Sequence, residues 1–265
     1  MSEPRAKHAF IGAGAGCAVL LLVGGITGVL AVVAALLLGK GDVGDPAGLE
    51  RYAMYGLPFQ HLALLSVTLW LASRFGGAAE LLAWKPARRW WLVLLVFPVG
   101  FVSDFVVHTA YEIAPWLDLG GLDLLDDALL GSGPLGMVLT GLGAIVLAPI
   151  AEEVLFRGYV FRGVSNSWGT VAAVAVSTLL FAVFHADPLH ALGVVVIGVW
   201  LGWLRHVTGS IKTCIAAHLL NNAFWVVESF AFETVPDSPW WIALIAAGGT
   251  IGVGVLVSRR APGLG

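Results

Sequence analysis

Charged residues are scarce in this chain, and their scarcity excludes an ordinary soluble domain. Asp, Glu, Lys and Arg make up 12% of its 265 residues, while hydrophobic residues make up 58%. In a soluble globular domain the charged share is about 25%. A chain this apolar, with 11 tryptophans and 34 glycines, has the composition of a membrane protein.

Cysteines are also few, and long basic runs are missing. The two cysteines, Cys17 and Cys214, both lie within apolar runs, so they imply no disulfide framework. The formal net charge is −3, and no long run of Lys and Arg interrupts the sequence. We therefore expect no nucleic-acid partner.

The usual signatures of three hydrolase classes are missing as well. The sequence contains no G-x-S-x-G elbow and no H-E-x-x-H motif, and neither cysteine lies in a recognisable nucleophile motif. Serine hydrolases, zincins and cysteine proteases are commonly marked by such patterns. Any hydrolytic activity is therefore expected to depend on other residues.

What the chain does have is a series of long apolar segments, eight of which are candidates for membrane-spanning helices. They are approximately Ala9–Leu38, Tyr52–Ala72, Trp90–His108, Leu135–Val154, Thr170–Ala186, Leu189–Leu204, Ile211–Phe230 and Trp240–Val257. No linker suggests a second domain. The sequence therefore predicts an all-α fold, a polytopic membrane helix bundle of about eight transmembrane helices, with residues 1–265 forming a single integral-membrane domain.

The positions of Lys and Arg predict the orientation of these helices, because both residues resist translocation across the membrane. With eight spans, twelve of the fourteen basic residues fall on one side, and only Lys40 and Arg51 fall on the other. Both termini are therefore predicted to be cytoplasmic. We expect a multi-pass protein of the cell (plasma) membrane, with the lipid bilayer as its surroundings.

Three charged residues interrupt the fourth apolar segment, in the stretch APIAEEVLFRGY (148–159). Glu153 and Arg157 are four residues apart with the glutamate first, which favours a helical ion pair. Glu152 lies about 100° away around the helix and lacks that partner. An intramembrane carboxylate of this kind is a functional candidate. The alternative is that all three charges are hydrated at the cytoplasmic interface.

Two further polar clusters follow in later segments. In FAVFHADP (181–188), Phe181 precedes His185 by about one turn, and in AAHLLNNAF (216–224), His218 and Asn222 share one helix face. Polar side chains within apolar helices need partners from other helices. A lone histidine near a helix end can also be an ordinary interfacial residue.

The helical rise allows the depths of these clusters to be compared. Counted from the cytoplasmic turns at about 1.5 Å per residue, Glu152, His218 and Asn222 lie roughly 18, 10 and 16 Å deep, and His185 lies roughly 25 Å deep. If they meet, Glu152 can act as a general base, an imidazole can hold water, and the other imidazole and the amide can stabilise an oxyanion. A glutamate with two histidines is equally an acceptable zinc ligand set.

In chain order, EEVLFR, FAVFH and HLLNN match the motifs EExxxR, FxxxH and HxxxN. Together they resemble the CPBP family of intramembrane proteases (CaaX proteases and bacteriocin-processing proteins, also called Abi proteins). The resemblance covers about Leu135–Phe230, which implies a catalytic core over about 135–230.

The resemblance implies a role for each matched residue. Glu152 would activate water together with His185, while His218 and Asn222 would stabilise the oxyanion. The family resembles glutamic-type enzymes, so no cofactor is favoured. The supporting residues would be Glu153, Arg157 and Phe181.

The function that the resemblance implies is an intramembrane endopeptidase. Its substrates would be peptides or membrane proteins, including prenylated ones. One alternative is a zinc-dependent protease that uses Glu152, His185 and His218 as ligands. The other is a non-catalytic membrane binding or transport protein with the same polar cavity.

The remaining polar residues of the apolar segments are interpreted as structural. His61, Asp104 and His108 lie outside the motif-bearing segments, and His190 and His206 are interpreted as interfacial. No motif points to any of them.

Overall fold

The structure is a computed structural model, which describes residues 56–74, 82–87, 89–120, 133–231 and 240–259 together with Ile26, Val33, Leu125 and Leu129. Every regular element in these residues is helical. The all-α fold class is therefore confirmed. Apart from two positions, the first expected span, Ala9–Leu38, lies outside the described residues.

The described chain contains eight α-helices and four shorter helical segments. The α-helices are α3 (Leu57–Arg74), α5 (Val96–Ile113), α7 (Gly133–Gly141), α8 (Ala148–Glu153), α9 (Phe161–Phe184), α10 (Pro188–Thr208), α11 (Ile211–Ala231) and α12 (Trp240–Arg259). Two short segments, η1 (Trp90–Leu95) and η2 (Pro115–Leu117), are 3-10 helices, while η3 (Leu142–Leu147) and η4 (Val154–Val160) are π-helical.

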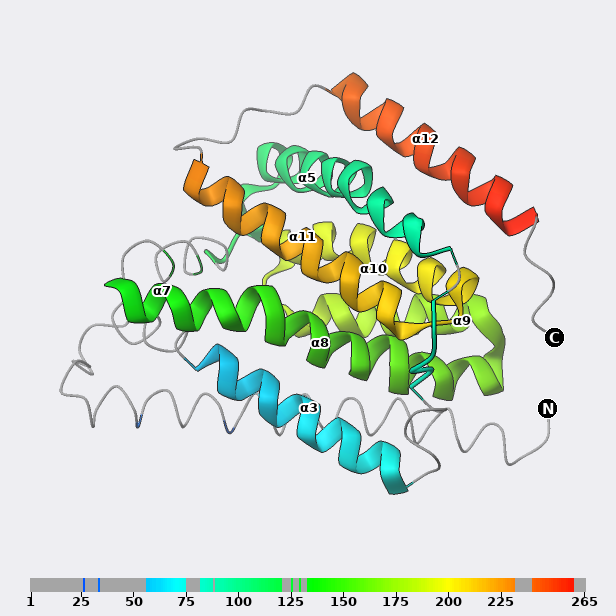
Figure 1. Ribbon diagram of the computed structural model, residues 1–265. Coiled ribbons are helices and arrows are strands. Elements are labelled where there is room, and N and C mark those ends of the chain that lie inside the picture. Colours follow the sequence, from blue (N-terminus) through cyan, green and yellow to red (C-terminus); the bar gives the residue numbers. More distant parts are fainter. Residues whose placement is uncertain are drawn as a thin grey trace.

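One continuous helical run from α7 to α9 carries the charged stretch (Figure 1). It changes from α- to π-helix on both sides of α8. Pro149 accounts for the first change, because proline donates no N–H and its ring crowds the preceding turn, which a wider π-turn accommodates.

At Gly169, φ of 82° and ψ of 175° interrupt the helix, and the run reverses direction (Figure 1). Its two arms correspond to the expected spans Leu135–Val154 and Thr170–Ala186.

Helix α10 lies in the middle of the bundle, packed against α9, α5 and α11 (Figure 1). Helix α12 packs against α5 at one edge, while α3 packs against α8 and η3 at the opposite edge. Helix α11 also contacts α8. The two adjacent glutamates at the end of α8 are therefore within reach of side chains from both α3 and α11.

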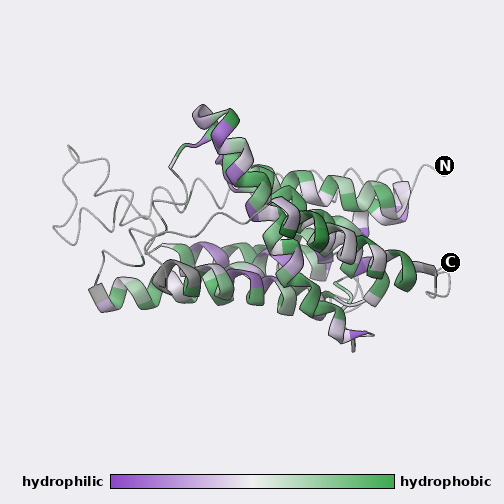
Figure 2. Ribbon diagram, turned by 90° about the horizontal axis from the view of Figure 1, so that it is seen from above, coloured by the Kyte–Doolittle hydropathy of each residue, from purple (hydrophilic) through white to green (hydrophobic). Residues whose placement is uncertain are grey.

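Hydrophobic residues predominate along the helices (Figure 2), and many large ones are exposed on the outside of the bundle, as the hydrocarbon core of a bilayer requires. Val171, Val183 and Ile113 are 85%, 74% and 72% exposed. Four described helical segments are long and apolar enough to cross a membrane: Trp90–Ile113, Pro134–Phe184, Pro188–Thr208 and Trp240–Ser258. The chain is an integral membrane protein. The total of about eight spans and the cytoplasmic location of both termini stay predictions.

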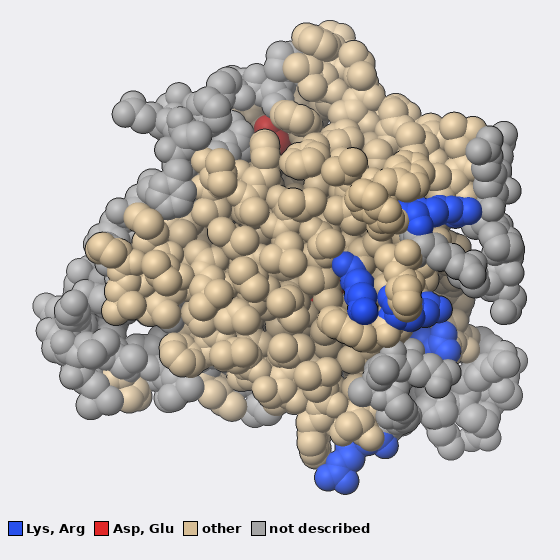
Figure 3. Space-filling model, in the orientation of Figure 1, with Lys and Arg blue, Asp and Glu red and all other residues tan. Residues whose placement is uncertain are grey.

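Lys and Arg side chains on the visible face lie toward the end of the molecule where α3 and α12 finish (Figure 3). This distribution agrees with the asymmetry expected from the sequence. Two of the residues assigned to that side are nevertheless buried in the protein, since Arg157 and Arg205 are 0% and 7% exposed. The Arg205 Nε donates to the carbonyl oxygen of Arg157 at 3.2 Å, so these two charges stabilise helix packing instead of contacting the aqueous phase.

Candidate active site

The three charged residues of the stretch APIAEEVLFRGY are buried inside the bundle. Glu152 is 4% exposed, and Glu153 and Arg157 are 0% exposed. The alternative that all three are hydrated at the membrane interface is therefore wrong. Burying three ionisable groups in an apolar bundle is costly unless each has partners, and those partners come from four other elements.

Glu153 and Arg157 form the expected ion pair, with Arg157 Nη1 donating to Glu153 Oε1 at 3.1 Å. Arg157 Nη2 donates to the carbonyl oxygen of Gly198 on α10 at 3.1 Å. Glycine allows this approach, because a Cβ at position 198 would lie 3.2 Å from Arg157 Nη2 and 2.9 Å from Thr178 Cγ2. The guanidinium also lies over the ring of Phe181, 4.3 Å from its centroid. Arg157 thus joins η4, α9 and α10.

His218 of α11 contacts both glutamates. Its Nδ1 donates to Glu153 Oε1 at 3.0 Å, and its Nε2 lies 3.8 Å from Glu152 Oε2. Because Glu153 already neutralises Arg157, its carboxylate orients the imidazole of His218 while the opposite ring nitrogen faces Glu152. The depths and the order of the motifs predicted that His218 lies near Glu152, and the structure brings the two together.

His61 of α3 makes the shortest contact with Glu152 found in the described part of the chain. Its Nε2 lies 3.2 Å from Glu152 Oε1, and its Nδ1 lies 2.8 Å from the carbonyl oxygen of Leu57. The side chain is 4% exposed. The sequence interpretation treated His61 as structural because no motif marks α3. The general rule that an intramembrane ionisable residue is a functional candidate would have found it.

His185 lies at the C-terminal end of α9, where the turn to α10 fixes its position. Ala186 has a left-handed φ of 57°, which is unfavourable for a residue with a Cβ. Asp187 caps α10 by accepting from the backbone N–H of His190 at 2.9 Å, and Pro188 starts that helix, as the missing N–H of proline permits. The sequence FHADP therefore encodes a tight interhelical turn next to a candidate site residue.

The ring of Phe181 contacts both His185 and His218. Its centroid lies 4.9 Å from the imidazole of His185 and 5.5 Å from that of His218, both in edge-to-face geometry. His185 Nδ1 donates to the carbonyl oxygen of Phe181 at 2.8 Å. The greater depth expected for His185 does not keep it from the cluster. The imidazole of His190 also contacts that of His185, with 4.8 Å between the ring centroids. The interpretation of His190 as interfacial did not predict this contact.

Asn222 faces another part of the site. Its Nδ2 donates to the carbonyl oxygen of Ala144 in η3 at 2.9 Å, and its Oδ1 accepts from Asn221 Nδ2 at 3.3 Å. The amide therefore fastens α11 to the π-helical segment that precedes the glutamates. The structure brings Glu152 and His218 together, places His185 against the Phe181 ring that also contacts His218, and joins Asn222 to the backbone of η3.

The donor types of the cluster suit zinc, but their arrangement does not. His61, His185 and His218 each use Nδ1 in another hydrogen bond, as metal-bound histidines commonly do. Within the described ranges, however, no group of three or more His, Cys, Asp or Glu side chains is placed so that it could hold a metal ion. The alternative ligand set Glu152, His185 and His218 does not fit in this conformation.

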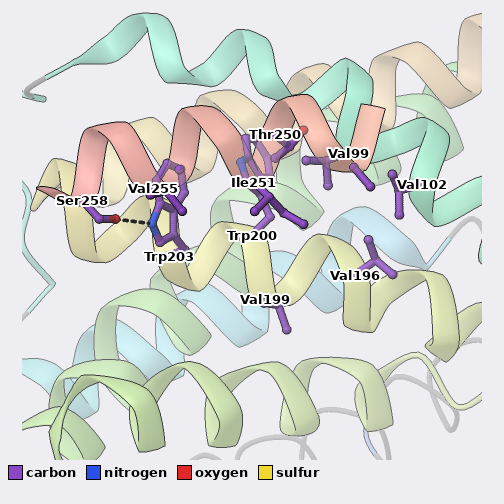
Figure 4. A pocket seen from close by; sticks show the side chains of 12 residues that line it. Val99, Val102, Val196, Val199, Trp200, Trp203, Thr250, Ile251, Val255 and Ser258 are labelled. Atoms are coloured by element: carbon purple, nitrogen blue, oxygen red, sulfur yellow. Dashed lines mark hydrogen bonds between the residues drawn. The ribbon is translucent and has the colours of Figure 1, made fainter. Parts of the chain in front are cut away.

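A separate cavity of about 570 Å³ lies between α5, α10 and α12 (Figure 4). Its walls are valines, tryptophans and Ile251, with a hydrogen bond from Trp203 Nε1 to Ser258 Oγ at 3.3 Å. No carboxylate or imidazole lines it. The buried glutamates and histidines lie on the α3, α8 and α11 side of α10, away from this cavity.

The buried cluster has the parts of an acid–base site. A carboxylate, Glu152, lies between two imidazoles from different helices, and the neighbouring Glu153 carboxylate orients one of them. A carboxylate in this setting can take a proton from water, and preorganised N–H groups beside it can stabilise developing negative charge. Fold and cluster together define a helical integral membrane protein with a buried glutamate–histidine site.

Comparison with known families agrees with this class. Residues 134–224 match the family model described as type II CAAX prenyl endopeptidase Rce1-like. That segment contains all three motifs, so the resemblance to the CPBP family is confirmed over it. His61, on α3, lies outside the matched segment.

One curated relative matches a similar length of chain. Over 82 residues the chain is 32% identical to the protein named "Putative membrane peptidase YdiL" of Bacillus subtilis (strain 168). The match covers 31% of this chain and 34% of that protein, so the chain spans about a third of the relative's length. No solved structure matches the chain.

Proposed function

We propose that the chain is an intramembrane endopeptidase that hydrolyses peptide bonds of membrane-associated or lipidated substrates by means of a glutamate-activated water. The observation that carries this proposal is the burial of Glu152 in contact with His61 and His218. An ionisable side chain within a membrane bundle is expensive and functional by default. The match of residues 134–224 to the type II CAAX prenyl endopeptidase model supports the same conclusion.

In the proposed reaction Glu152 is the general base. A water molecule held beside Glu152 and His185 attacks the carbonyl carbon of the scissile peptide bond, and its proton passes to the Glu152 carboxylate. A C–O bond forms as the water O–H bond breaks. The same proton then passes to the leaving nitrogen, the C–N bond breaks, and a carboxylic acid and an amine result.

The oxyanion of that reaction is assigned to His218 and Asn222. His218 Nδ1 is committed to Glu153, so only Nε2 is available to a substrate, and it donates only when the ring is protonated. The carboxylate of Glu153 stabilises that charged ring. Asn222 donates one amide hydrogen to Ala144 and has a second amide hydrogen for the substrate.

A matched pair of glutamate variants tests the proposal. Glu152→Gln keeps the shape of the side chain and removes the base, and Glu112→Gln on α5 (side chain 67% exposed) is the control. Membranes of cells that produce wild type, Glu152→Gln or Glu112→Gln are compared by quantitative proteomics for uncleaved precursors. We expect precursors to accumulate with Glu152→Gln alone, because losing a general base costs roughly 10² to 10⁴ in rate.

The outcome also separates the alternatives. Identical precursor profiles for wild type and Glu152→Gln would refute the endopeptidase hypothesis. The remaining hypothesis would be a membrane binding or transport protein. Purified protein that contains stoichiometric zinc, and that loses cleavage on chelation and regains it with zinc, would replace the glutamate mechanism with the zinc-dependent one. We further propose that the protein resides in the plasma membrane and that prenylated peptides are among its substrates. A farnesylated peptide ending in a CaaX sequence is the direct probe.

A further inference from the structure

His61 is a buried titratable residue that none of the three motifs contains. It lies on α3, more than seventy positions before the matched segment begins, yet it makes the 3.2 Å contact with Glu152 Oε1. Helix α3 packs directly on α8. The general base of the proposed reaction is therefore held by an element that the family model does not cover.

The hydrogen bond of His61 to Leu57 determines which ring nitrogen bears a hydrogen. A carbonyl oxygen can only accept, so the contact of Nδ1 with the Leu57 oxygen at 2.8 Å requires a hydrogen on Nδ1. In a neutral ring Nε2 then has a lone pair, which would oppose the lone pairs of an ionised Glu152. The contact of Nε2 with Oε1 becomes a hydrogen bond only if one further proton lies between the two side chains.

The same reasoning excludes His218 as the holder of Glu152. Its Nδ1–H is directed at Glu153, the partner of Arg157, and its Nε2 is 3.8 Å from Glu152 Oε2, beyond hydrogen-bond distance. In the described part of the chain the ionisable groups around Glu152 are His61 from α3, His218 from α11, and His185 with its neighbour His190 at the turn between α9 and α10. The Glu153–Arg157 pair lies on the same run of helix as Glu152. Among them His61 alone is placed within hydrogen-bond distance of the Glu152 carboxyl group, as far as the described residues show.

We propose that His61 is a positioning residue for Glu152: it shares a proton with Oε1 and so leaves Oε2, on the side of His218, to receive the proton of the attacking water. This inference rests on the proposed function and deepens it. With His61 protonated on both nitrogens, Oε1 is held by a charge-assisted hydrogen bond. Oε2 accepts the water proton and later returns it to the leaving nitrogen, and the His61 proton is not consumed.

Two variants of His61 separate this role from a packing role. The amide nitrogen of His61→Gln can occupy the place of Nε2 and donate to Glu152, while that of His61→Asn can reach only the Leu57 oxygen. Initial rates are measured on purified full-length protein in lipid vesicles with a farnesylated CaaX peptide that carries a fluorophore and a quencher. His108→Gln on α5, with a side chain 46% exposed, is the control, and thermal unfolding is recorded for every variant.

We expect kcat of His61→Asn to fall roughly 10²-fold, the effect of misplacing a reacting group by about 1 Å, with KM little changed. His61→Gln is expected to retain most of the rate, and His108→Gln all of it. Equal loss in His61→Asn and His61→Gln, in step with their melting temperatures, would show a packing role and overturn the inference. Full activity of His61→Asn would overturn it as well.

Glu152→Gln in the same assay keeps the two proposals distinguishable. If Glu152→Gln is inactive while His61→Asn is fully active, the endopeptidase stands and the positioning role fails. If Glu152→Gln is fully active, the general base is misassigned.

A second measurement requires no substrate. Nitrogen NMR spectra are recorded on ¹⁵N-histidine-labelled protein, and the His61 signals are assigned by their loss in His61→Gln. The inference requires the Nε2 signal of His61 to shift in Glu152→Ala, and an unchanged signal would contradict it.

Discussion

The two sides of α10 differ in what they bury. Toward α3, α8 and α11 lie two glutamates, an arginine and three histidines, which make contacts of 2.8 to 3.2 Å with one another or with backbone carbonyl oxygens. Toward α5 and α12 lies an apolar cavity with the single side-chain hydrogen bond between Trp203 and Ser258 in its walls (Figure 4). In an apolar bundle an unpaired polar group is costly, so we expect substitutions to destabilise the protein more on the polar side than on the apolar side.

This difference predicts that substitutions cost most where they leave a buried charge alone. Arg157→Met removes the partner of Glu153 and the donor to the Gly198 oxygen. Breaking a buried ion pair in this way costs about 3–5 kcal/mol. We expect a strong loss of folded protein, measured as the midpoint of dodecyl sulfate unfolding. A midpoint within error of wild type would mean that the pair does not stabilise the bundle.

A smaller effect is expected from crowding the same arginine. Gly198→Ala places a Cβ 2.9 Å from Thr178 Cγ2 and 3.2 Å from Arg157 Nη2, and overpacking of this kind costs about 1–3 kcal/mol. Thr178→Ser removes the closer atom and should restore part of the stability. Gly252→Ala, where a Cβ meets nothing within 4 Å, is the matched control. The contact is unimportant if both glycine variants unfold alike.

The smallest effect is expected on the apolar side. Trp203→Phe removes the hydrogen bond to Ser258 but keeps an aromatic ring in the wall of the cavity. A partly exposed hydrogen bond of this kind contributes about 1 kcal/mol or less. We expect a small change in the unfolding midpoint and an unchanged hydrolysis rate. A loss of hydrolysis comparable to that of Glu152→Gln would show that this cavity takes part in the reaction. It would contradict the functional difference between the two sides of α10.

Much of the site could be predicted from the sequence because local spacing determines it. The i,i+4 spacing of Glu153 and Arg157 predicted their ion pair, and the structure has it. The order of motifs predicted that Glu152 and His218 approach each other, and they do. Two features depend on partners from distant segments and were not predicted: Arg157 is buried against α9 and α10, and His61, interpreted as structural, contacts Glu152.

By itself the sequence determined an all-helical membrane protein, because apolar runs of sufficient length can satisfy their backbone groups in lipid only as helices. It also determined the local ion pair and the residue types available for chemistry. Only the tertiary structure decided which nitrogen of each histidine faces Glu152 and that α3 supplies one of those histidines. Contacts between residues 91 positions apart depend on how helices pack against one another, and no pattern within a single helix encodes that packing.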